Sequence, residues 1–375
     1  MGKERKEFFK SLPKELTYKP YDNVTIGKYI IGKNRPVFII AEAGSNHRGN
    51  INNAFKLINK AKEAKADAIK FQHLTHNKIA ADNIVYDTWN GKPVGALSNF
   101  FKSAELPYEW TPKLIAYARK KGIMFLSTPF DKEAVNILNK SKVDAFKIGS
   151  YELTDDILLS CIAKTKKPII LSTGMADMEE IAHAIKTIQQ AGNKQIILLH
   201  CVSMYPPAFT DLNLRAVSTL RQSFKIPIGY SDHSKPPYIA PSIVAVALGA
   251  SVIEKHLTDN QSGGSNDDSN SIDVENFKLF VQEIRHAEMA LSQNGIKQPV
   301  INAGHKNDEI FDRWSRRSVY AAVDLKPGDI ISEKNIITLR PWGGIEPKNF
   351  YLFQGQKLRK GVKARKPLTI KHFQI

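Results

Sequence analysis

The residues best suited to chemistry stand near the ends of short apolar runs that resemble β-strands. Two lysines, Lys70 and Lys147, lie inside such runs (AIKFQ and FKIGS). An unpaired ammonium group is costly to bury, so both lysines need anions nearby. Hydroxyl side chains end the same or neighbouring runs: Ser127, Thr128, Ser150, Ser172 and Ser231. The pattern indicates a pocket for a compound that carries both a phosphate and a carboxylate. A lysine that forms a Schiff base is the alternative, since a second cation would lower its pKa.

Two histidines, His233 and His256, stand at the ends of the last two runs. If these runs are neighbouring strands, both imidazoles can reach one ion. Two nitrogen ligands are too few for a structural zinc site. An open site, completed by water and a substrate oxygen, suits a divalent ion that acts as a Lewis acid on a carbonyl. We expect Mn²⁺ or Mg²⁺, with Zn²⁺ and Co²⁺ as alternatives.

A repeating architecture must position these residues, and the chain shows one. Eight apolar runs rich in β-branched residues recur, at 37–43, 67–72, 122–128, 143–150, 168–173, 195–201, 226–231 and 251–257. Helical patterns, with apolar residues every three or four positions, fall at 51–65, 110–120, 131–140, 177–191, 212–223, 239–249 and 276–291. This alternation predicts a (β/α)8 TIM barrel, whose chemistry lies at the carboxyl ends of the strands. A doubly wound open sheet is the alternative, although no G-x-G-x-x-G follows the first run.

Pattern and composition divide the chain into four parts. They are an N-terminal extension with a segment that would plug the barrel (1–35), the barrel (36–292), a linker (293–315) and a small β-rich domain (316–375). Short strand-like runs separated by Lys-Pro-Gly-Asp and Pro-Trp-Gly-Gly mark the last part.

The interval between the second and third runs, 73–121, is longer than a connection and a helix require. It carries four aromatic residues, Tyr86, Trp89, Phe100 and Phe101. Two interpretations remain open: a lid over the pocket, or a surface excursion packed on its own aromatic side chains.

Composition excludes several classes of protein. With 42% hydrophobic and 9% aromatic residues, the chain is expected to fold throughout. No apolar run is long enough to cross a bilayer, so we expect a cytoplasmic protein without a membrane partner. The formal net charge of +17 is concentrated at the chain ends, with no basic amphipathic helix, and we expect no nucleic-acid partner.

Taken in order, the motifs resemble those of the sialic acid synthases, also called N-acetylneuraminate or nonulosonic acid synthases. The resemblance covers about residues 36–375. It rests on IIAEAGSNHRG (39–49), AIKFQ (68–72), STPFD (127–131), KIGSYE (147–152), ILSTGM (170–175), LHCVSMYP (199–206), GYSDH (229–233), ALGASVIEKHLT (247–258), RRSVYAAVDLKPGDII (316–331) and LRPWGGI (339–345). The last two resemble the antifreeze-like SAF domain that follows the barrel in this family.

The resemblance implies a metal-dependent transferase that condenses phosphoenolpyruvate with an open-chain amino-sugar aldehyde such as N-acetylmannosamine. The products would be a nine-carbon 2-keto acid and inorganic phosphate. Phosphoenolpyruvate would be held by Lys70, Thr128, Lys147, Ser150, Ser172 and Ser231. The metal would be held by His233 and His256, and Glu254 or a metal-bound water would serve the step in which water captures C2.

The sugar side of the site is also carried over from the resemblance. It comprises Glu42, Gln72, Glu152, Ser203, Tyr205, Asp267 and Arg340. Glu42, Glu254 and His233 are the expected catalytic residues. Arg340 matches an arginine that the SAF domain inserts into the partner's barrel, which implies a domain-swapped homodimer.

Departures from the family pattern fall on the sugar side. Ser203 stands where Asn is frequent, Tyr151 stands where Gly is common, and the loop 262–272 lacks the usual Pro. With these residues, the sequence resembles pseudaminic or legionaminic acid synthases, whose acceptor is a 2,4-diacetamido-6-deoxy sugar. A synthase that acts on a shorter sugar phosphate is a further alternative, and a noncatalytic binding module that retains the fold is the third.

Overall fold

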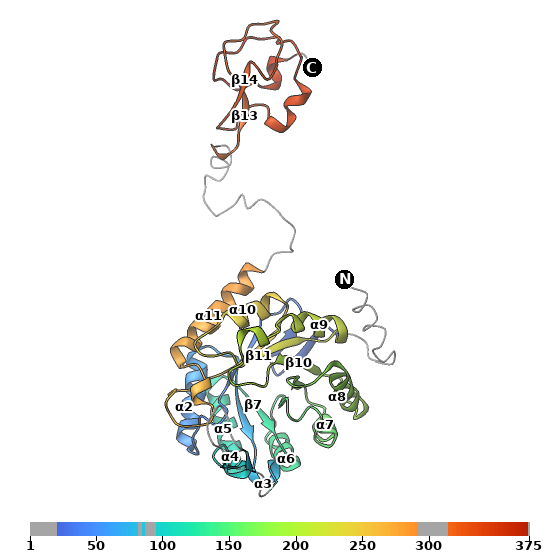
Figure 1. The fold of residues 1–375 in the computed structure, drawn as a ribbon, viewed down its shortest axis with the longest axis vertical. Helices are drawn as coiled ribbons and strands as arrows, with labels where there is room; N and C mark the ends of the chain where they lie inside the picture. The colour runs from blue at the N-terminus through green and yellow to red at the C-terminus, as the bar shows by residue number, and fades with distance from the viewer. Residues whose placement is uncertain (1–20, 82–84, 87–94, 292–313, 374–375) are drawn as a thin grey trace. The chain divides into compact units, whose positions relative to one another are not determined.

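The computed structural model describes residues 21–81, 85–86, 95–291 and 314–373. The chain forms two compact units, Met1–Gln293 and Asn294–Ile375. Part of the N-terminal extension, Trp89 and most of the expected linker lie outside the described residues. Figure 1 shows the ribbon of both units.

Within the described residues, eight parallel strands form the first unit's main sheet. They are β3 (Phe38–Glu42), β4 (Ala68–His73), β7 (Met124–Pro129), β8 (Phe146–Ile148), β9 (Ile169–Ser172), β10 (Ile196–Cys201), β11 (Ile228–Asp232) and β12 (Val252–His256). Their order is β7-β4-β3-β12-β11-β10-β9-β8, and the two end strands contact each other, so the sheet is a nearly closed barrel. The predicted TIM barrel is confirmed.

Helices cover the outside of the barrel (Figure 1). They are α2 (Ile51–Glu63), α5 (Thr111–Lys121), α6 (Lys132–Lys140), α7 (Asp156–Ala163), α8 (Met178–Gln190), α9 (Arg215–Phe224), α10 (Ala240–Ala247) and α11 (Val274–Ala290). Local signals set several boundaries, such as the capping box of Asp177 and Glu180 at the start of α8. The sequence patterns missed α7. Its sequence, DILLSCIA, is mostly apolar, so it lacks the polar face that marks an amphipathic helix.

The inward faces of the strands are apolar at one end of the barrel and polar at the other. Inward residues such as Ile40, Leu126 and Ile170 form a cluster at the amino ends of the strands. The hairpin of β1 (Asn23–Ile26) and β2 (Tyr29–Gly32) adds its buried residues, Ile26 among them, to this cluster. Apolar packing therefore fills one end of the barrel and leaves the space at the other end for polar side chains.

The interval between β4 and β7 contains short elements: α3 (His76–Ile79), β5 (Val85–Tyr86), β6 (Gly95–Ala96), α4 (Leu97–Lys102) and η1 (Tyr108–Trp110). Buried hydrogen bonds fasten its two ends to the barrel. His73, at the end of β4, contacts Ser127 Oγ through Nδ1 at 2.5 Å and Thr111 Oγ1 through Nε2 at 2.6 Å. The loop after β10 contains the short helix η2 (Phe209–Asp211), and the loop after β12 contains η3 (Asp268–Asn270).

The C-terminal unit is small and has its own core. Two antiparallel strands, β13 (Ser318–Ala321) and β14 (Ile336–Leu339), are accompanied by η4 (Pro347–Leu352) and η5 (Ile370–His372). Val319, Ile331 and Leu368 are fully buried in its core.

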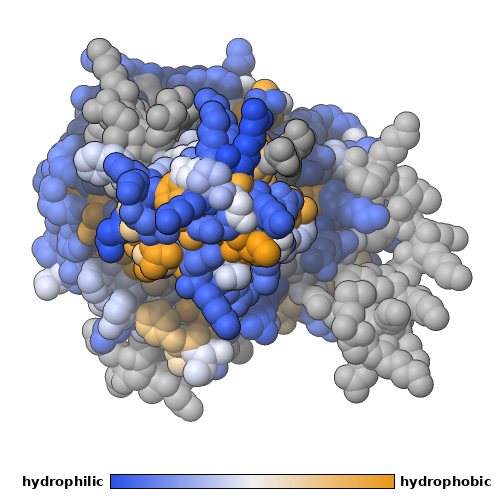
Figure 2. Space-filling model, turned by 90° about the horizontal axis from the view of Figure 1, so that it is seen from above, coloured by the Kyte–Doolittle hydropathy of each residue, from blue (hydrophilic) through white to orange (hydrophobic). Residues whose placement is uncertain are grey.

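The view in Figure 2 shows a largely hydrophilic face with hydrophobic side chains between the polar ones. None of the helices in the described ranges has the length and apolar character needed to cross a bilayer.

Candidate active site

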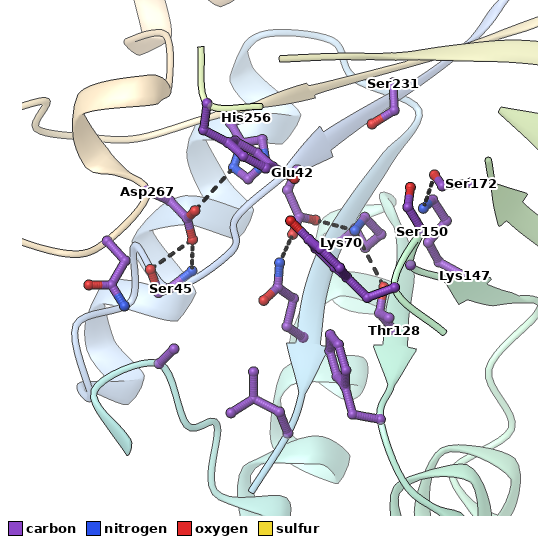
Figure 3. A pocket seen from close by; sticks show the side chains of 18 of the residues that line it. Glu42, Ser45, Lys70, Thr128, Lys147, Ser150, Ser172, Ser231, His256 and Asp267 are labelled. Atoms are coloured by element: carbon purple, nitrogen blue, oxygen red, sulfur yellow. Dashed lines mark hydrogen bonds and ion pairs between the residues drawn. The ribbon is translucent and has the colours of Figure 1, made fainter. Parts of the chain in front are cut away.

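Polar side chains at the carboxyl ends of the strands line one cavity of about 480 Å³ (Figure 3). The volume lies within the ordinary range for small-molecule sites. Strand register brings the key residues together, because Glu42 pairs with Lys70 on one side and with His256 on the other. The expected residues that line the cavity are Glu42, Lys70, Gln72, Thr128, Lys147, Ser150, Glu152, Ser172, Tyr205, Ser231, His233, Glu254, His256 and Asp267.

Two lysines and two glutamates form the charged floor of this cavity: Glu42, Lys70, Lys147 and Glu254. Lys70 Nζ lies 2.8 Å from Glu42 Oε2 and 3.4 Å from Glu254 Oε1. Lys147 Nζ lies 3.9 Å from the same Glu254 oxygen. The anions that the buried lysines require are therefore partly supplied by the protein itself, and Glu254 stands between the two cations.

Burial and the neighbouring charges shift the pKa values of three groups of the floor in different directions. Burial opposes the charge of Glu254, but Lys147 and Lys70 outweigh it and hold the pKa of this carboxyl at about 2. Burial also opposes the charge of Lys70, yet Glu254 and Glu42 raise its pKa. For Lys147, burial and the charge of Lys70 prevail over Glu254, and its pKa is lowered. Lys147 is thus the cation with most to gain from a further anion.

Hydroxyl groups surround both lysines. Lys147 Nζ donates to Ser172 Oγ at 2.6 Å, and Lys70 Nζ donates to Thr128 Oγ1 at 3.4 Å. Ser231 Oγ donates to Glu254 Oε1 at 3.1 Å. Ser150 Oγ accepts from Gly174 N at 3.0 Å and lies 2.9 Å from Cys201 Sγ. A ligand oxygen placed here would find ammonium and hydroxyl donors on several sides, which is how proteins bind phosphate and carboxylate.

The two histidines lie side by side, with ring centroids 5.7 Å apart. His233 Nδ1 is 2.8 Å from the carbonyl oxygen of Val202, and burial and His256 lower the pKa of His233 to about 3. A neutral imidazole whose Nδ1–H donates to a carbonyl leaves Nε2 as a ligand nitrogen. His256 Nδ1 is buried and has no hydrogen-bond partner among the described residues. The pair fits an open divalent-cation site. No cluster of three or more potential ligands from His, Cys, Asp and Glu occurs in the described part of the chain.

Three further polar residues surround the histidines and the floor. Gln72 Nε2 donates to Glu42 Oε1 at 2.8 Å. Asp267 Oδ2 accepts from both the backbone nitrogen and Oγ of Ser45, each at 2.7 Å, while Oδ1 lies 4.0 Å from His256 Nδ1. Figure 3 shows Asp267 and His256 on one side of Glu42, and Lys147, Ser150 and Ser172 on the other.

Two of the expected sugar-side residues need separate description. Ser203 lies beside Gly174, where an added methyl group would approach its Oγ to 2.4 Å, and it does not line the cavity. Arg340 is exposed in the C-terminal unit. Some strand-end residues point away from the cavity. Ser127, for example, contacts the buried His73 and does not line the cavity.

Sequence reasoning missed several cavity residues. Ser45 lies in the AGSNH motif and Cys201 ends β10, but neither sequence position signals a contact with the cavity. The interval after β4 contributes Leu97, Phe100 and Phe101 to the lining. Only its unusual length and aromatic content hinted at such a role.

Comparison with known proteins identifies the family to which the chain belongs. The model of the NeuB family matches residues 57–296, and the model of the SAF domain matches residues 316–374. The chain belongs to the NeuB family. A pseudaminic acid synthase of Campylobacter jejuni is 37% identical over 348 residues, covering 91% of this chain and 97% of that protein. An N,N'-diacetyllegionaminic acid synthase of the same species is 38% identical over 334 residues, covering 88% and 98%.

A solved structure agrees with this assignment. The N-acetylneuraminic acid synthetase of Leptospira borgpetersenii, crystallised in complex with citrate, superposes with a TM-score of 0.69 and 35% sequence identity. The match covers 80% of this chain and 98% of that one. This NeuB-family chain is therefore an enzyme, a nonulosonic acid synthase with a C-terminal SAF domain, as the sequence motifs predicted.

Proposed function

We propose that this enzyme condenses phosphoenolpyruvate with an open-chain amino-sugar aldehyde, giving a nonulosonic acid and inorganic phosphate. The observation that carries the proposal is the set of side chains that line one cavity. Two buried lysines and four hydroxyl groups converge there beside a pair of imidazoles. Both ammonium groups are held by oxygen acceptors, which favours binding of an anion over formation of a Schiff base.

Lys70, Lys147 and the hydroxyls of Thr128, Ser150, Ser172 and Ser231 would hold the phosphate and carboxylate of phosphoenolpyruvate. Lys147 donates to Ser172 and is only weakly paired with Glu254, at 3.9 Å, so its charge is available. Phosphoenolpyruvate bound here would share the cations that now stabilise ionised Glu254. Sharing them raises the pKa of Glu254 and makes this carboxylate a better proton acceptor.

A divalent cation, which we propose to be Mn²⁺ or Mg²⁺, would be held by His233 and His256 and would polarise the aldehyde oxygen of the sugar. The neutral state of His233 supports this role, since an imidazolium has no lone pair for a metal. Glu42 and Asp267 line the same cavity as the imidazoles, and their carboxylates can accept hydrogen bonds from sugar hydroxyls.

In the reaction, the C2=C3 π electrons of phosphoenolpyruvate form the new bond from C3 to the aldehyde carbon. The π bond of the aldehyde breaks, and its oxygen takes up a proton from water to become a hydroxyl. C2 is then electron-poor, and a water molecule adds to it. Glu254 is suited to take the proton of this water, because Oε2 has no hydrogen-bond partner in the described structure. The C2–O bond to phosphate then breaks, and loss of the remaining hydroxyl proton leaves the 2-keto acid.

The acceptor is either N-acetylmannosamine or a 2,4-diacetamido-6-deoxy sugar of the kind used for pseudaminic and legionaminic acids. The names of two relatives support the second candidate.

The test is release of inorganic phosphate from phosphoenolpyruvate across a panel of acceptors. The panel contains N-acetylmannosamine, its 6-phosphate, both diacetamido sugars and a four-carbon aldose phosphate. We expect release with an amino sugar, loss of activity after EDTA and recovery after Mn²⁺ or Mg²⁺ is added. Release only with the aldose phosphate would favour the shorter-substrate alternative, and no release with any acceptor would refute condensation.

A further inference from the structure

The cavity has an apolar side in addition to the charged floor. Six residues from the interval between β4 and β7 form this apolar wall: Leu74, Ile79, Leu97, Phe100, Phe101 and Ala104. The two phenylalanines are half-buried neighbours on α4, with ring centroids 5.4 Å apart. Half-buried aromatic rings that line a cavity offer apolar surface to whatever fills it.

Hydrogen bonds join the wall to the sugar side of the site. Asn266 Nδ2 donates to the carbonyl oxygen of Phe100 at 3.4 Å and to Ser103 Oγ at 3.2 Å. The next residue, Asp267, is held by Ser45 at 2.7 Å and faces His256. The wall and the proposed sugar ligand Asp267 are thus positioned by one connected segment.

At the other end of the wall, His76 and Glu105 tie the start of α3 to the residues that follow α4. The backbone nitrogen of His76 donates to Glu105 Oε1 at 2.6 Å, and its Nδ1 lies 2.5 Å from the same oxygen. Apolar side chains held in this way can discriminate between substituents, because they neither withdraw from a polar group nor supply it with a partner.

We infer that α4, through Leu97, Phe100 and Phe101, selects the acceptor by the substituent on its distal carbon. This inference rests on the proposed condensation. The wall accommodates a methyl group, as in a 6-deoxy sugar, and disfavours a hydroxymethyl or phosphorylated end. A hydroxyl or phosphate placed against it loses water without gaining a hydrogen-bond partner there, whereas a methyl group gains apolar contact.

The test compares two acceptors that differ at one position, a 2,4-diacetamido-6-deoxy hexose and the same sugar with a 6-hydroxyl. We expect kcat/KM to favour the deoxy sugar about 10- to 100-fold, the range in which apolar pockets discriminate against an added hydroxyl. Phe101→Ala should reduce this preference at least several-fold, and Leu97→Asn should reduce it by giving the hydroxyl a partner. Phe209→Ala is the matched control, since Phe209 is 53% exposed and does not line the cavity.

The preference is a ratio measured on one preparation, so partial unfolding of a variant does not alter it. Equal kcat/KM for the two sugars, a preference for the 6-phosphate of N-acetylmannosamine, or an unchanged ratio in Phe101→Ala would each overturn the inference while leaving the condensation in place. Absence of phosphate release with every acceptor would instead refute the proposed function and the inference with it.

Discussion

At the scale of single residues, the site depends on four buried charges that compensate one another. Lys70 is shared by Glu42 and Glu254, while Lys147 has Glu254 at 3.9 Å and the hydroxyl of Ser172 at 2.6 Å. Buried charges of this kind are tolerated only when paired and hydrogen-bonded. Because Lys147 is the less well paired cation, it is the one we expect to contribute most to binding a substrate anion.

Replacement of Lys147 by Met tests this role. A charge-assisted hydrogen bond contributes about 1.5–3 kcal/mol, so we expect kcat/KM for phosphoenolpyruvate to fall at least 10-fold. Steady-state phosphate release measures the change. Lys164→Met is the control, since Lys164 is exposed at the end of α7 and should leave the kinetics unchanged. Kinetics of Lys147→Met like those of the native enzyme would contradict anion binding by this residue.

Glu152 makes a prediction about pH. Burial raises the pKa of its carboxyl from about 4.5 to about 7, against the pull of Lys147. The folded chain therefore retains a proton that the unfolded chain releases near pH 4.5. Its contribution to the free energy of unfolding falls as the pH rises from about 4.5 to 7 and is constant above.

Glu152→Gln removes this dependence while keeping the shape of the side chain. We expect the variant to gain thermal stability over the native protein at pH 8, and to gain less at pH 5. Melting curves without substrate at both pH values measure the difference. Glu109→Gln, at an exposed position, serves as the control. The same difference in Tm at both pH values would show that Glu152 is ionised throughout.

At the scale of elements, several strands contribute an apolar residue to the plugged end of the barrel and a polar one to the cavity. Glu42 follows Ile40 on the inner face of β3, and Ser172 follows Ile170 on the inner face of β9. Side chains two positions apart share a face of a strand, so a single alternation serves both stability and chemistry.

Gly229 on β11 shows how tightly this interior is packed. A methyl group at this position would lie 2.5 Å from both Val252 O and Leu199 Cδ2. We expect Gly229→Ala to lower the free energy of unfolding by ~1–3 kcal/mol, the usual cost of overpacking. Chemical denaturation measures it. Gly343→Ala, whose methyl would meet no atom within 4 Å, is the control. An unchanged midpoint in Gly229→Ala would mean that the barrel expands there without cost.

At the scale of the whole molecule, the two units have separate cores among the described residues. The barrel buries its strands and helices around side chains of its own, and the SAF domain buries Val319 and Leu368 in a core that shares no residue with them. Arg340 belongs to the SAF domain and is exposed in the single chain. The family resemblance places it in the barrel of a second subunit, so we propose a domain-swapped homodimer.

Arg340→Ala should then raise KM for the sugar more than KM for phosphoenolpyruvate. An equal effect on both would remove the claim. Arg359→Ala, at another exposed position of the same domain, is the matched control. Light scattering on the native enzyme should give the mass of a dimer.

A mixing experiment probes the swap directly. In a heterodimer of Arg340→Ala and Lys147→Met subunits, the intact barrel receives its arginine from the other subunit. With random assortment, half of the dimers are mixed and have one complete site, so about one quarter of native activity should return. If mixing restores nothing although the subunits exchange, Arg340 acts within its own chain.

Much of this enzyme was predictable from local sequence. Strands and most helices follow from the spacing of apolar residues, and Lys70 and Lys147 were recognisable because a lysine in a buried strand must have an anion. The patterns failed at α7, whose apolar residues cover most of its surface. They also left open which strand-end residues face the cavity: Ser127 and Thr128 are adjacent, yet only Thr128 lines it.

The sequence by itself determined the barrel, the family and the residue types available for catalysis, because periodicity and motif order are properties of neighbouring residues. Only the tertiary structure decided that Glu254 stands between two lysines, that Ser45 holds Asp267, and that α4 supplies an apolar wall. The contacts of Glu254 with the lysines and of Ser45 with Asp267 join residues 107 to 222 positions apart. They exist only once the barrel closes and brings the ends of distant strands to one mouth.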